Sequence, residues 1–187
     1  GEILCKGPNV MKGYFKDSKL TAKTIKNGFL YTGDIGEIDK DGFLKITDRK
    51  KQLFKTSGGK YIAPQVIENK MKRSPFIEQV MVIGEGEKMP SALIQPDFQY
   101  VKNWLLNNKF PFSDDLKKIC LNNELLTKIN LEINKINEEF GDWERIKKFE
   151  LTPEIWSIEN GLLTPTMKLK RKSIMEKFIH LKEKIYN

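Results

Sequence analysis

The stretch TDRKKQLFKTSGGKYIAP at residues 47–64 separates two parts of the chain that are patterned differently, and it contains five basic residues and one acid. Its Gly58-Gly59 pair lies between two short β-prone runs, 53–56 and 60–63, which is a strong signal for a hairpin turn. Because glycine has no Cβ, a ligand can approach the backbone closely at such a turn. We interpret the stretch as a hinge followed by a loop that faces a ligand.

The residues before this stretch predict short strands joined by turns. A strand is expected at 1–6, and a hairpin is expected from strands at 35–38 and 43–47 with Gly42 in its turn. Such an all-β piece is too small to close a core alone. Since the sequence begins inside a strand-like segment without methionine, we expect the chain to be a fragment of a longer protein.

The residues after the stretch mix helical and extended patterns. We expect strands at 78–83, 91–95 and 148–151, and helices that start at Pro64, after caps at Asp97 and Ser113, at 124–140 with Gly141 as its end, and from Arg171. The strand at 78–83 is nearly all apolar at its centre, residues 80–83, which is typical of a strand covered on both faces. The predicted class is α+β: a small β-rich piece, 1–48, is joined by a hinge to a compact α+β domain, 49–187, with a small sheet flanked by helices.

Composition narrows the functional classes. Two distant cysteines, Cys5 and Cys120, indicate free thiols in a reducing compartment, and no secretory signal or membrane-length apolar run is present. The net charge of +8 raises the question of nucleic acid or anionic lipid as a partner. The lysines are spread along the chain and aromatic residues do not alternate with them, so a solvated basic surface is the favoured interpretation.

Two residues of the first part suit a nucleotide. Asp34 follows Gly33 near a strand end, and one carboxylate can accept hydrogen bonds from both hydroxyls of a ribose. Taken locally, a turn aspartate that bonds its own backbone is the stronger reading. Arg49 has a planar fork that suits a phosphate or a ribose oxygen, and a surface ion pair is an equally good alternative.

In the second part, Lys168 follows a Thr-Pro-Thr turn and precedes an amphipathic helix. A lysine on a loop can bring a point charge to a developing negative charge, although a solvated lysine is the default for any single one. The only histidine, His180, lies off the apolar face of its helix, so a Ser/His/Asp set is not expected. No cluster with metal-ligand spacing is visible, so no metal-ligating residue is predicted.

Four segments, taken in order, resemble the C-terminal third of AMP-forming acyl-CoA synthetases, members of the adenylate-forming superfamily. They are GEILCKGPNVMKGY at 1–14, GFLYTGDIG at 28–36, DRKKQLFKTSGGKYIAP at 48–64 and NGLLTPTMKLKR at 160–171. The last two are most similar to the long-chain fatty acid–CoA ligase branch. Relatives outside this branch often carry glycine where this chain has Met167, so we expect a stiffer turn here.

The resemblance implies a two-step reaction of the intact enzyme. Fatty acid and ATP give acyl-adenylate and pyrophosphate, a small C-terminal domain then swings, and coenzyme A attacks the adenylate. The implied ligands are ATP or AMP, coenzyme A, and Mg²⁺ held mainly by the missing N-terminal part. The ATP phosphate loop and the fatty acid tunnel are expected upstream of Gly1, so we expect the fragment alone to be inactive.

The resemblance also implies roles for single residues. Asp34 would hold the AMP ribose and Arg49 would contact the nucleotide. Lys168 would bridge the substrate carboxylate and the α-phosphate during adenylation. Gly58 and Gly59 would form the loop that lines the pantetheine path. Asp48 and Lys51 would form the hinge.

Two alternatives stay open at this point. One is an adenylation domain that loads a carrier protein instead of coenzyme A, since the final basic helix suits an acidic carrier. The other is a basic module that binds nucleic acid or anionic lipid. For the leading interpretation the partners are small molecules and no nucleic acid. A cytoplasmic location is expected, with peripheral membrane contact through the basic segment 168–184.

Overall fold

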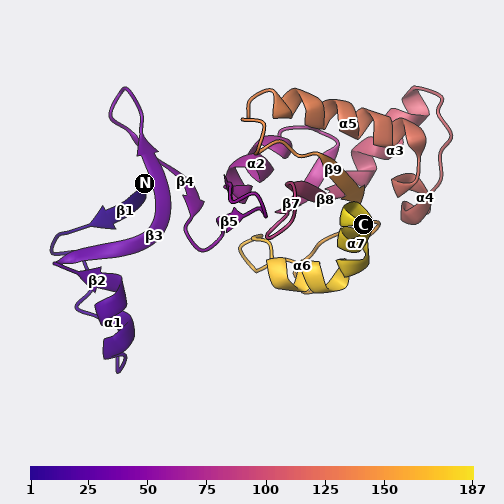
Figure 1. Ribbon diagram of the computed structural model, residues 1–187. Helices are drawn as coiled ribbons and strands as arrows, with labels where there is room; N and C mark the ends of the chain where they lie inside the picture. Colours follow the sequence, from indigo (N-terminus) through magenta and orange to yellow (C-terminus); the bar gives the residue numbers. More distant parts are fainter. The chain divides into compact units, whose positions relative to one another are not determined.

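The computed structural model describes residues 1–187, which form two compact units, Gly1–Leu53 and Phe54–Asn187 (Figure 1). The sequence-based boundary lay after Asp48, whereas the structural division follows Leu53. The backbone N–H of Leu53 donates to the carbonyl of Arg49 (3.2 Å), so a turn keeps these residues with the first unit. That the two units are the end of a large adenylating domain and a mobile domain stays a prediction.

The first unit is an antiparallel sheet around one long strand. Its elements are β1 (Glu2–Cys5), α1 (Ser18–Thr24), β2 (Ile25–Lys26), β3 (Phe29–Ile38) and β4 (Leu44–Arg49). Strand β3 pairs with all three other strands, in the order β1-β3-β2 with β4 also on β3 (Figure 1). The predicted hairpin is therefore confirmed as β3–β4, although β3 starts earlier than the sequence suggested.

Helix α1 shows that the first part is β-rich rather than all-β. Asp17 caps the helix, because its Oδ1 accepts a hydrogen bond from the backbone N–H of Leu20 (2.8 Å). The segment is mostly polar with only a few apolar residues at helical spacing, and the helix buries no residue. No apolar side chain of residues 1–53 is buried, in keeping with the prediction that this piece cannot close a core alone.

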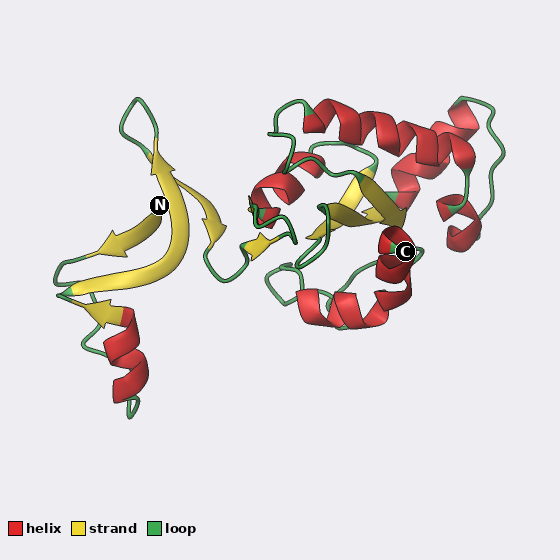
Figure 2. Cartoon of the chain, viewed as in Figure 1, coloured by secondary structure: helices red, strands yellow, loops and turns green.

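The second unit is a small sheet between helices, which confirms the α+β class (Figure 2). Its strands are β5 (Phe54–Lys55), β6 (Tyr61–Ile62), β7 (Ile77–Ile83), β8 (Ser91–Pro96) and β9 (Lys148–Leu151). Its helices are α2 (Pro64–Met71), α3 (Phe98–Asn107), α4 (Leu116–Cys120), α5 (Asn123–Asn137), α6 (Arg171–Lys177) and α7 (Ile179–Tyr186). Strand β8 is central, antiparallel to β7 and parallel to β9.

The central sheet is buried on both faces, as the apolar run in β7 predicted. Val80 and Val82 belong to a core cluster with residues of α2, α3 and α5, while Met81 and Ile83 belong to a second cluster. The second cluster also contains Trp156, Leu162, Leu163, Ile174, Phe178 and Ile185. Burial of about 1.5–3 kcal/mol per large apolar side chain on each face makes β7 and β8 the stable centre of this unit.

Three helix predictions are corrected by the structure. The cap of α4 is Asp115, whose Oδ1 accepts from the N–H of Lys117 (2.9 Å), and not Ser113. Helix α5 ends at Asn137, and Gly141 lies beyond it with the ring of Trp143 over its backbone, so Gly141 is not a left-handed helix end.

The predicted final helix is two helices, α6 and α7, which break at Phe178 (φ −110°, ψ 27°). The break lets the ring of Phe178 stack on Trp156, with centroids 6.2 Å apart, inside the second core cluster. None of the helices in residues 1–187 has the length and apolar content that crossing a membrane requires.

Candidate active site

Asp34 and Arg49 face each other across strands β3 and β4. They are register partners in the sheet, and the Arg49 Nε lies 2.8 Å from Asp34 Oδ1. The side chain of Arg49 is 59% exposed and that of Asp34 is 21% exposed. The structure therefore brings together the two residues that the sequence singled out for a nucleotide, although they are separated in the chain by a whole hairpin.

Local backbone geometry sets the direction of the Asp34 side chain. Gly33 adopts a left-handed conformation (φ +74°), and the N–H of Asp34 donates to Thr32 Oγ1 (3.1 Å). The Asp34 carboxylate pairs with Arg49 and makes no hydrogen bond to its own backbone, so the turn-aspartate alternative does not describe it. The guanidinium group of Arg49 is 59% exposed, and its N–H groups can donate to a phosphate or ribose oxygen.

The predicted hinge residues are in different environments. Asp48 is 1% exposed, and its Oδ1 accepts the N–H of Arg49 (2.6 Å). Lys51 is exposed in the turn that follows β4. Between the register pairs Ile35–Asp48 and Gly36–Ile46 the sheet carries one extra residue, which is a β-bulge at the end of β4. The hinge role of Asp48 and Lys51 stays a prediction.

Gly58 and Gly59 are in the tip of the hairpin formed by β5 and β6. The N–H of Thr56 donates to the carbonyl of Lys60 (3.1 Å), and the N–H of Gly59 donates to the carbonyl of Thr56 (2.9 Å). Gly59 is left-handed (φ +77°), and no heavy atom lies within 4 Å of the place where its Cβ would be. The tip is exposed backbone, open to a ligand chain.

A second turn supports this glycine loop. The N–H of Ser57 donates to the carbonyl of Glu87 (2.8 Å), and that of Gly86 donates to the carbonyl of Lys55 (2.9 Å). The C-terminal helix α7 holds the second turn, because the Tyr186 hydroxyl donates to the carbonyl of Met89 (3.0 Å). Burial raises the pKa of the Tyr186 phenol to about 12.

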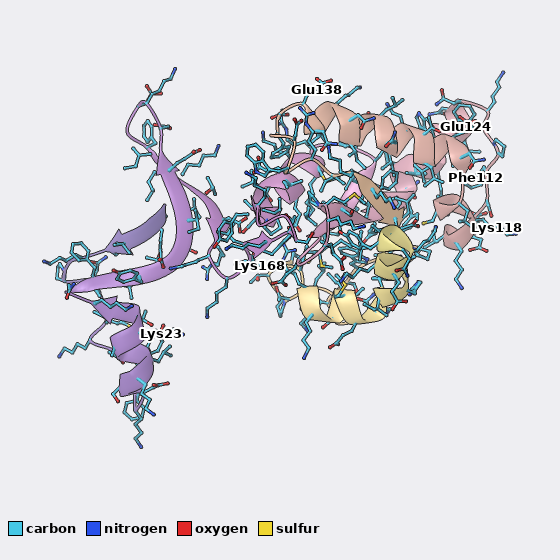
Figure 3. All side chains as sticks on the ribbon, viewed as in Figure 1. Lys23, Phe112, Lys118, Glu124, Glu138 and Lys168 are labelled. Atoms are coloured by element: carbon cyan, nitrogen blue, oxygen red, sulfur yellow. The ribbon has the colours of Figure 1, made fainter.

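Lys168 is presented by a loop with the same turn geometry as the glycine loop. The N–H of Thr164 donates to the carbonyl of Lys168 and the N–H of Met167 donates to the carbonyl of Thr164, both at 2.8 Å. Met167 is left-handed (φ +58°), and Leu163 and Leu169 form a β-bridge below the tip. The side chain of Lys168 is exposed, and its Nζ has no hydrogen-bond or ion-pair partner in the chain (Figure 3).

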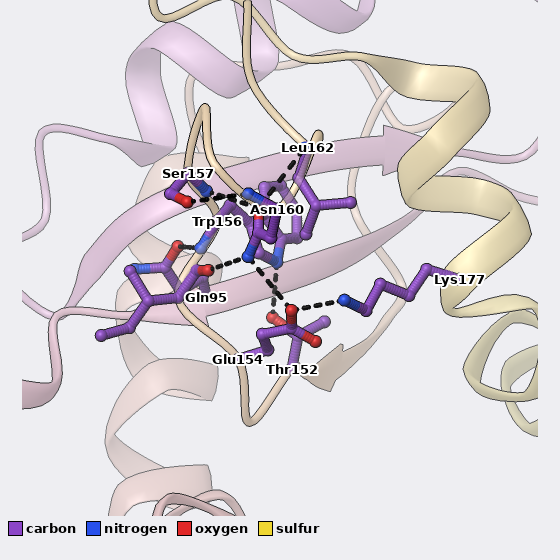
Figure 4. A network of polar contacts seen from close by, with 9 residues as sticks. Gln95, Thr152, Glu154, Trp156, Ser157, Asn160, Leu162 and Lys177 are labelled. Atoms are coloured by element: carbon purple, nitrogen blue, oxygen red, sulfur yellow. Dashed lines mark hydrogen bonds and ion pairs between the residues drawn. The ribbon is translucent and has the colours of Figure 1, made fainter.

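A network of hydrogen bonds anchors the N-terminal side of the loop that carries Lys168 (Figure 4). Asn160 Oδ1 accepts from the N–H groups of Ser157 (3.0 Å) and Leu162 (3.4 Å). Its Nδ2 donates to Glu154 Oε1 (3.1 Å), and Glu154 is ion-paired with Lys177 of α6. The asparagine of the predicted motif at 160–171 thus fixes the entry to the lysine loop.

A buried ion pair anchors the leg that follows Lys168. Arg171 Nη2 lies 2.8 and 2.6 Å from the two carboxylate oxygens of Glu68, and Glu68 Oε1 also accepts from the N–H of Val82 (2.7 Å). The Glu68 side chain is 7% exposed and that of Arg171 is 27% exposed. Sequence reasoning missed this pair, although a signal was present.

The buried positions of α2 are Pro64, Ile67, Glu68 and Met71, which is the spacing of an apolar helix face. A carboxylate on that face needs a partner. The sequence alone could not say that the partner would be Arg171.

Among residues 1–187 no group of three or more histidine, cysteine, aspartate or glutamate side chains is placed to hold a metal ion. The buried Cys120 thiol is not a candidate nucleophile either, because burial raises its pKa to about 12. The chemical groups that the chain offers are therefore the Asp34–Arg49 pair, the open glycine backbone and the Lys168 ammonium.

Comparison with known proteins decides the family. Residues 51–187 match the family described as AMP-binding enzyme C-terminal domain. The chain belongs to this family. This AMP-binding enzyme C-terminal domain is 36% identical over 187 residues to long-chain-fatty-acid–CoA ligase FadD15 of Mycobacterium tuberculosis. The alignment covers 100% of this chain and 31% of that protein.

Other AMP-binding relatives have similar names. The chain is 41% identical over 182 residues to human long-chain-fatty-acid–CoA ligase 1, covering 95% of this chain and 26% of the human protein. It is 37% identical over 190 residues to fatty acyl-CoA synthetase B of Dictyostelium discoideum, covering 100% and 28%. The chain thus spans less than a third of the length of these curated relatives.

Solved structures contain the same fold. The adenylation domain of a carboxylate reductase from Mycobacterium chelonae superposes with a TM-score of 0.77 at 23% identity, over 98% of this chain and 27% of that chain. O-succinylbenzoate coenzyme A synthetase from Bacillus subtilis in complex with AMP superposes with a TM-score of 0.62 at 26% identity, over 93% and 30%. The predicted resemblance to the C-terminal part of AMP-forming acyl-CoA synthetases is confirmed by the family match and by the relatives.

Proposed function

We propose that this chain is the C-terminal part of a long-chain fatty acid–CoA ligase. The complete protein would convert fatty acid and ATP to acyl-adenylate and pyrophosphate, and then convert acyl-adenylate and coenzyme A to acyl-CoA and AMP. The names of relatives with 36–41% identity over most or all of this chain support the substrate class. The observation that carries the catalytic role is Lys168, an exposed ammonium without a partner on a loop that is anchored at both ends.

In the first half-reaction a carboxylate oxygen of the fatty acid attacks the α-phosphorus of ATP, and pyrophosphate leaves. Two negatively charged groups must approach each other, and charge builds up on the phosphoryl oxygens. An ammonium placed between them stabilises the transition state more than the separated substrates, which is the condition for catalysis. We assign this role to Lys168, and we assign binding of the ribose to Asp34 and contact with the nucleotide to Arg49.

In the second half-reaction the thiol of coenzyme A attacks the acyl carbon, and AMP leaves. The thiol arm needs a path past the protein, and the open backbone at Gly58 and Gly59 offers a surface that lacks side chains. The lysine and the thiol arm cannot occupy one site together, so we propose that the domain turns about Asp48 and Lys51 between the steps. Mg²⁺ would be held mainly by the part of the complete protein that lies N-terminal to this chain.

The two alternatives have weaker support. A carrier-loading role would draw on the likeness to the carboxylate reductase domain, but at 23% identity that likeness concerns the fold only. A nucleic-acid module has no family support. We also propose a cytoplasmic location with peripheral contact at membranes, where exposed lysines such as Lys170 would meet anionic lipid. Co-sedimentation with vesicles of phosphatidylserine and phosphatidylcholine at low and high salt tests this contact.

Pyrophosphate release by the complete protein tests the proposed function. Fatty acid should stimulate ATP-dependent release, and coenzyme A should then be acylated. The 187-residue chain alone should release no pyrophosphate, because we place the ATP phosphate loop outside it. Acylation of a carrier protein, with no acylation of free coenzyme A, would favour the carrier-loading alternative over the proposal. Turnover by the isolated chain would refute the proposal that the ATP phosphate loop lies outside it.

A further inference from the structure

We propose that Glu68 and Arg171 are positioning residues for Lys168, and that they also tie the lysine loop to the element that carries the glycine loop. This inference rests on the proposed function, because it concerns the placement of the lysine that acts in adenylation. The two residues touch neither nucleotide nor acyl group in the proposed roles. They would act through the backbone of the loop.

The connectivity of the pair is the first argument. Arg171 is the first residue of α6 and follows the loop directly, and the N–H of Lys170 donates to the carbonyl of Leu162 (2.9 Å) at the base of that loop. Glu68 belongs to α2, whose first residue comes directly after the hairpin that contains Gly58 and Gly59. One ion pair therefore joins the elements that carry the candidate groups of both half-reactions.

The environment of the pair is the second argument. The Arg171 Nη2 lies within hydrogen-bond distance of both Glu68 oxygens, and Glu68 is additionally fixed by the N–H of Val82 in the central strand β7. At 7% side-chain exposure the Glu68 carboxylate is largely removed from water, so the pair is costly to break and geometrically restrictive. Flexible surface pairs do not have this property.

The pair also has a structural counterpart that makes a matched control. Lys172 and Glu176, on the same helix α6, form an ion pair of 3.8 Å whose side chains are 90% and 67% exposed. Neutralising that pair likewise removes one basic and one acidic group, but it does not touch the core or the loop. If burial and the link to the loop matter, loss of the Glu68–Arg171 pair should impair adenylation, and loss of the Lys172–Glu176 pair should not.

The experiment compares Glu68→Gln/Arg171→Met with Lys172→Met/Glu176→Gln in the complete protein. The buried double variant replaces both charges by side chains of similar size, which avoids leaving one charge unpaired. We expect adenylation kcat to fall by about tenfold or more with a KM for ATP within about twofold, because small misplacements of a catalytic group are costly in rate. Thioester formation from supplied acyl-adenylate should stay within about twofold, and the exposed double variant should match the parent in all three measurements.

Hydrogen exchange of the complete protein gives a readout that does not depend on activity. The amides of Thr164 and Met167, which close the loop, should exchange about tenfold faster in the buried double variant than in the parent. In the exposed double variant their exchange rates should equal those of the parent. Arg171→Lys, which keeps a charge beside Glu68, should restore most of the protection. If the buried double variant does not fold, Glu68→Gln alone replaces it, since glutamine keeps an acceptor for Val82.

The outcomes separate the two claims. Unchanged loop exchange and unchanged adenylation, or an equal loss in both half-reactions, would overturn the positioning role. Lys168→Ala serves as the reference: if it leaves adenylation intact, the proposed function fails whatever the ion pair does. If it abolishes adenylation while the buried double variant remains fully active, only the positioning role fails.

Discussion

Gly59 and Met167 occupy the same position in two hairpin loops of the second unit. Each is the left-handed residue that precedes a lysine, with φ of +77° at Gly59 and +58° at Met167. In both loops the N–H of this residue donates to the carbonyl of a threonine, Thr56 or Thr164. This is a three-residue hairpin loop, a turn followed by a left-handed residue, in which glycine is the usual choice.

The comparison predicts opposite effects for matched substitutions. Met167→Gly should stabilise the second unit by about 0.5–1 kcal/mol, because relief of left-handed strain exceeds the entropy cost of glycine. Gly59→Met should destabilise it by a similar amount. Urea unfolding of the two variants and the parent measures the difference, and a loss of stability in Met167→Gly would show that its side chain packs more usefully than the strain costs.

Lys168→Ala should abolish adenylation and leave thioester formation from supplied acyl-adenylate nearly unchanged. The reason is that the ammonium stabilises charge that develops only in the first step. Separate assays of pyrophosphate release and of coenzyme A acylation in the complete protein check this. Lys172→Ala is the control, because Lys172 is 90% exposed on helix α6, which follows the loop of Lys168. Equal losses in both half-reactions would contradict the assigned role.

Asp34→Asn should weaken AMP binding by about tenfold, since loss of a hydrogen bond to a charged group costs about 1.5 kcal/mol. The stability of the protein should hardly change, because Arg49 is 59% exposed and such a pair contributes under about 1 kcal/mol.

Calorimetric titration with AMP and a thermal melt of the complete protein measure both quantities. The control is Glu2→Gln, which removes the similarly exposed partner of Lys50 in the same sheet. Equal weakening of AMP binding by the two variants would show that the nucleotide senses net charge and not the Asp34 carboxylate.

Tyr186→Phe should lower stability at neutral pH by about 1 kcal/mol, through loss of its hydrogen bond to the carbonyl of Met89. Burial raises the folded-state pKa of Tyr186 to about 12, above the ordinary value of about 10. The phenol therefore contributes its full stabilisation below about pH 10, and that contribution is lost as the pH rises toward 12.

The difference between parent and Tyr186→Phe should consequently shrink over this pH range in urea unfolding. Tyr100→Phe, which removes the hydroxyl of a residue that is 40% exposed, is the control for the loss of a tyrosine hydroxyl. A constant difference for Tyr186→Phe would contradict the predicted linkage.

Much of the fold could be predicted from local patterns. The apolar run 80–83 of β7, the Asp97 cap of α3 and the glycine hairpin were each visible in a few neighbouring residues, and the structure contains all three. The errors concerned helix boundaries, which depend on contacts with residues that are distant in the sequence. The last helix breaks at Phe178, whose ring packs on the distant Trp156, and α5 stops before Gly141.

By itself the sequence determined the chemistry: which charged groups are present, which segments are flexible enough to form loops, and which family the chain resembles. The tertiary structure alone decided which of those groups act together. Asp34 meets Arg49 because antiparallel pairing brings β3 and β4 into register, and Glu68 meets Arg171 because α2 and α6 meet at strand β7. A buried charge must find its counter-charge in space, and sequence separation places no limit on where that partner lies.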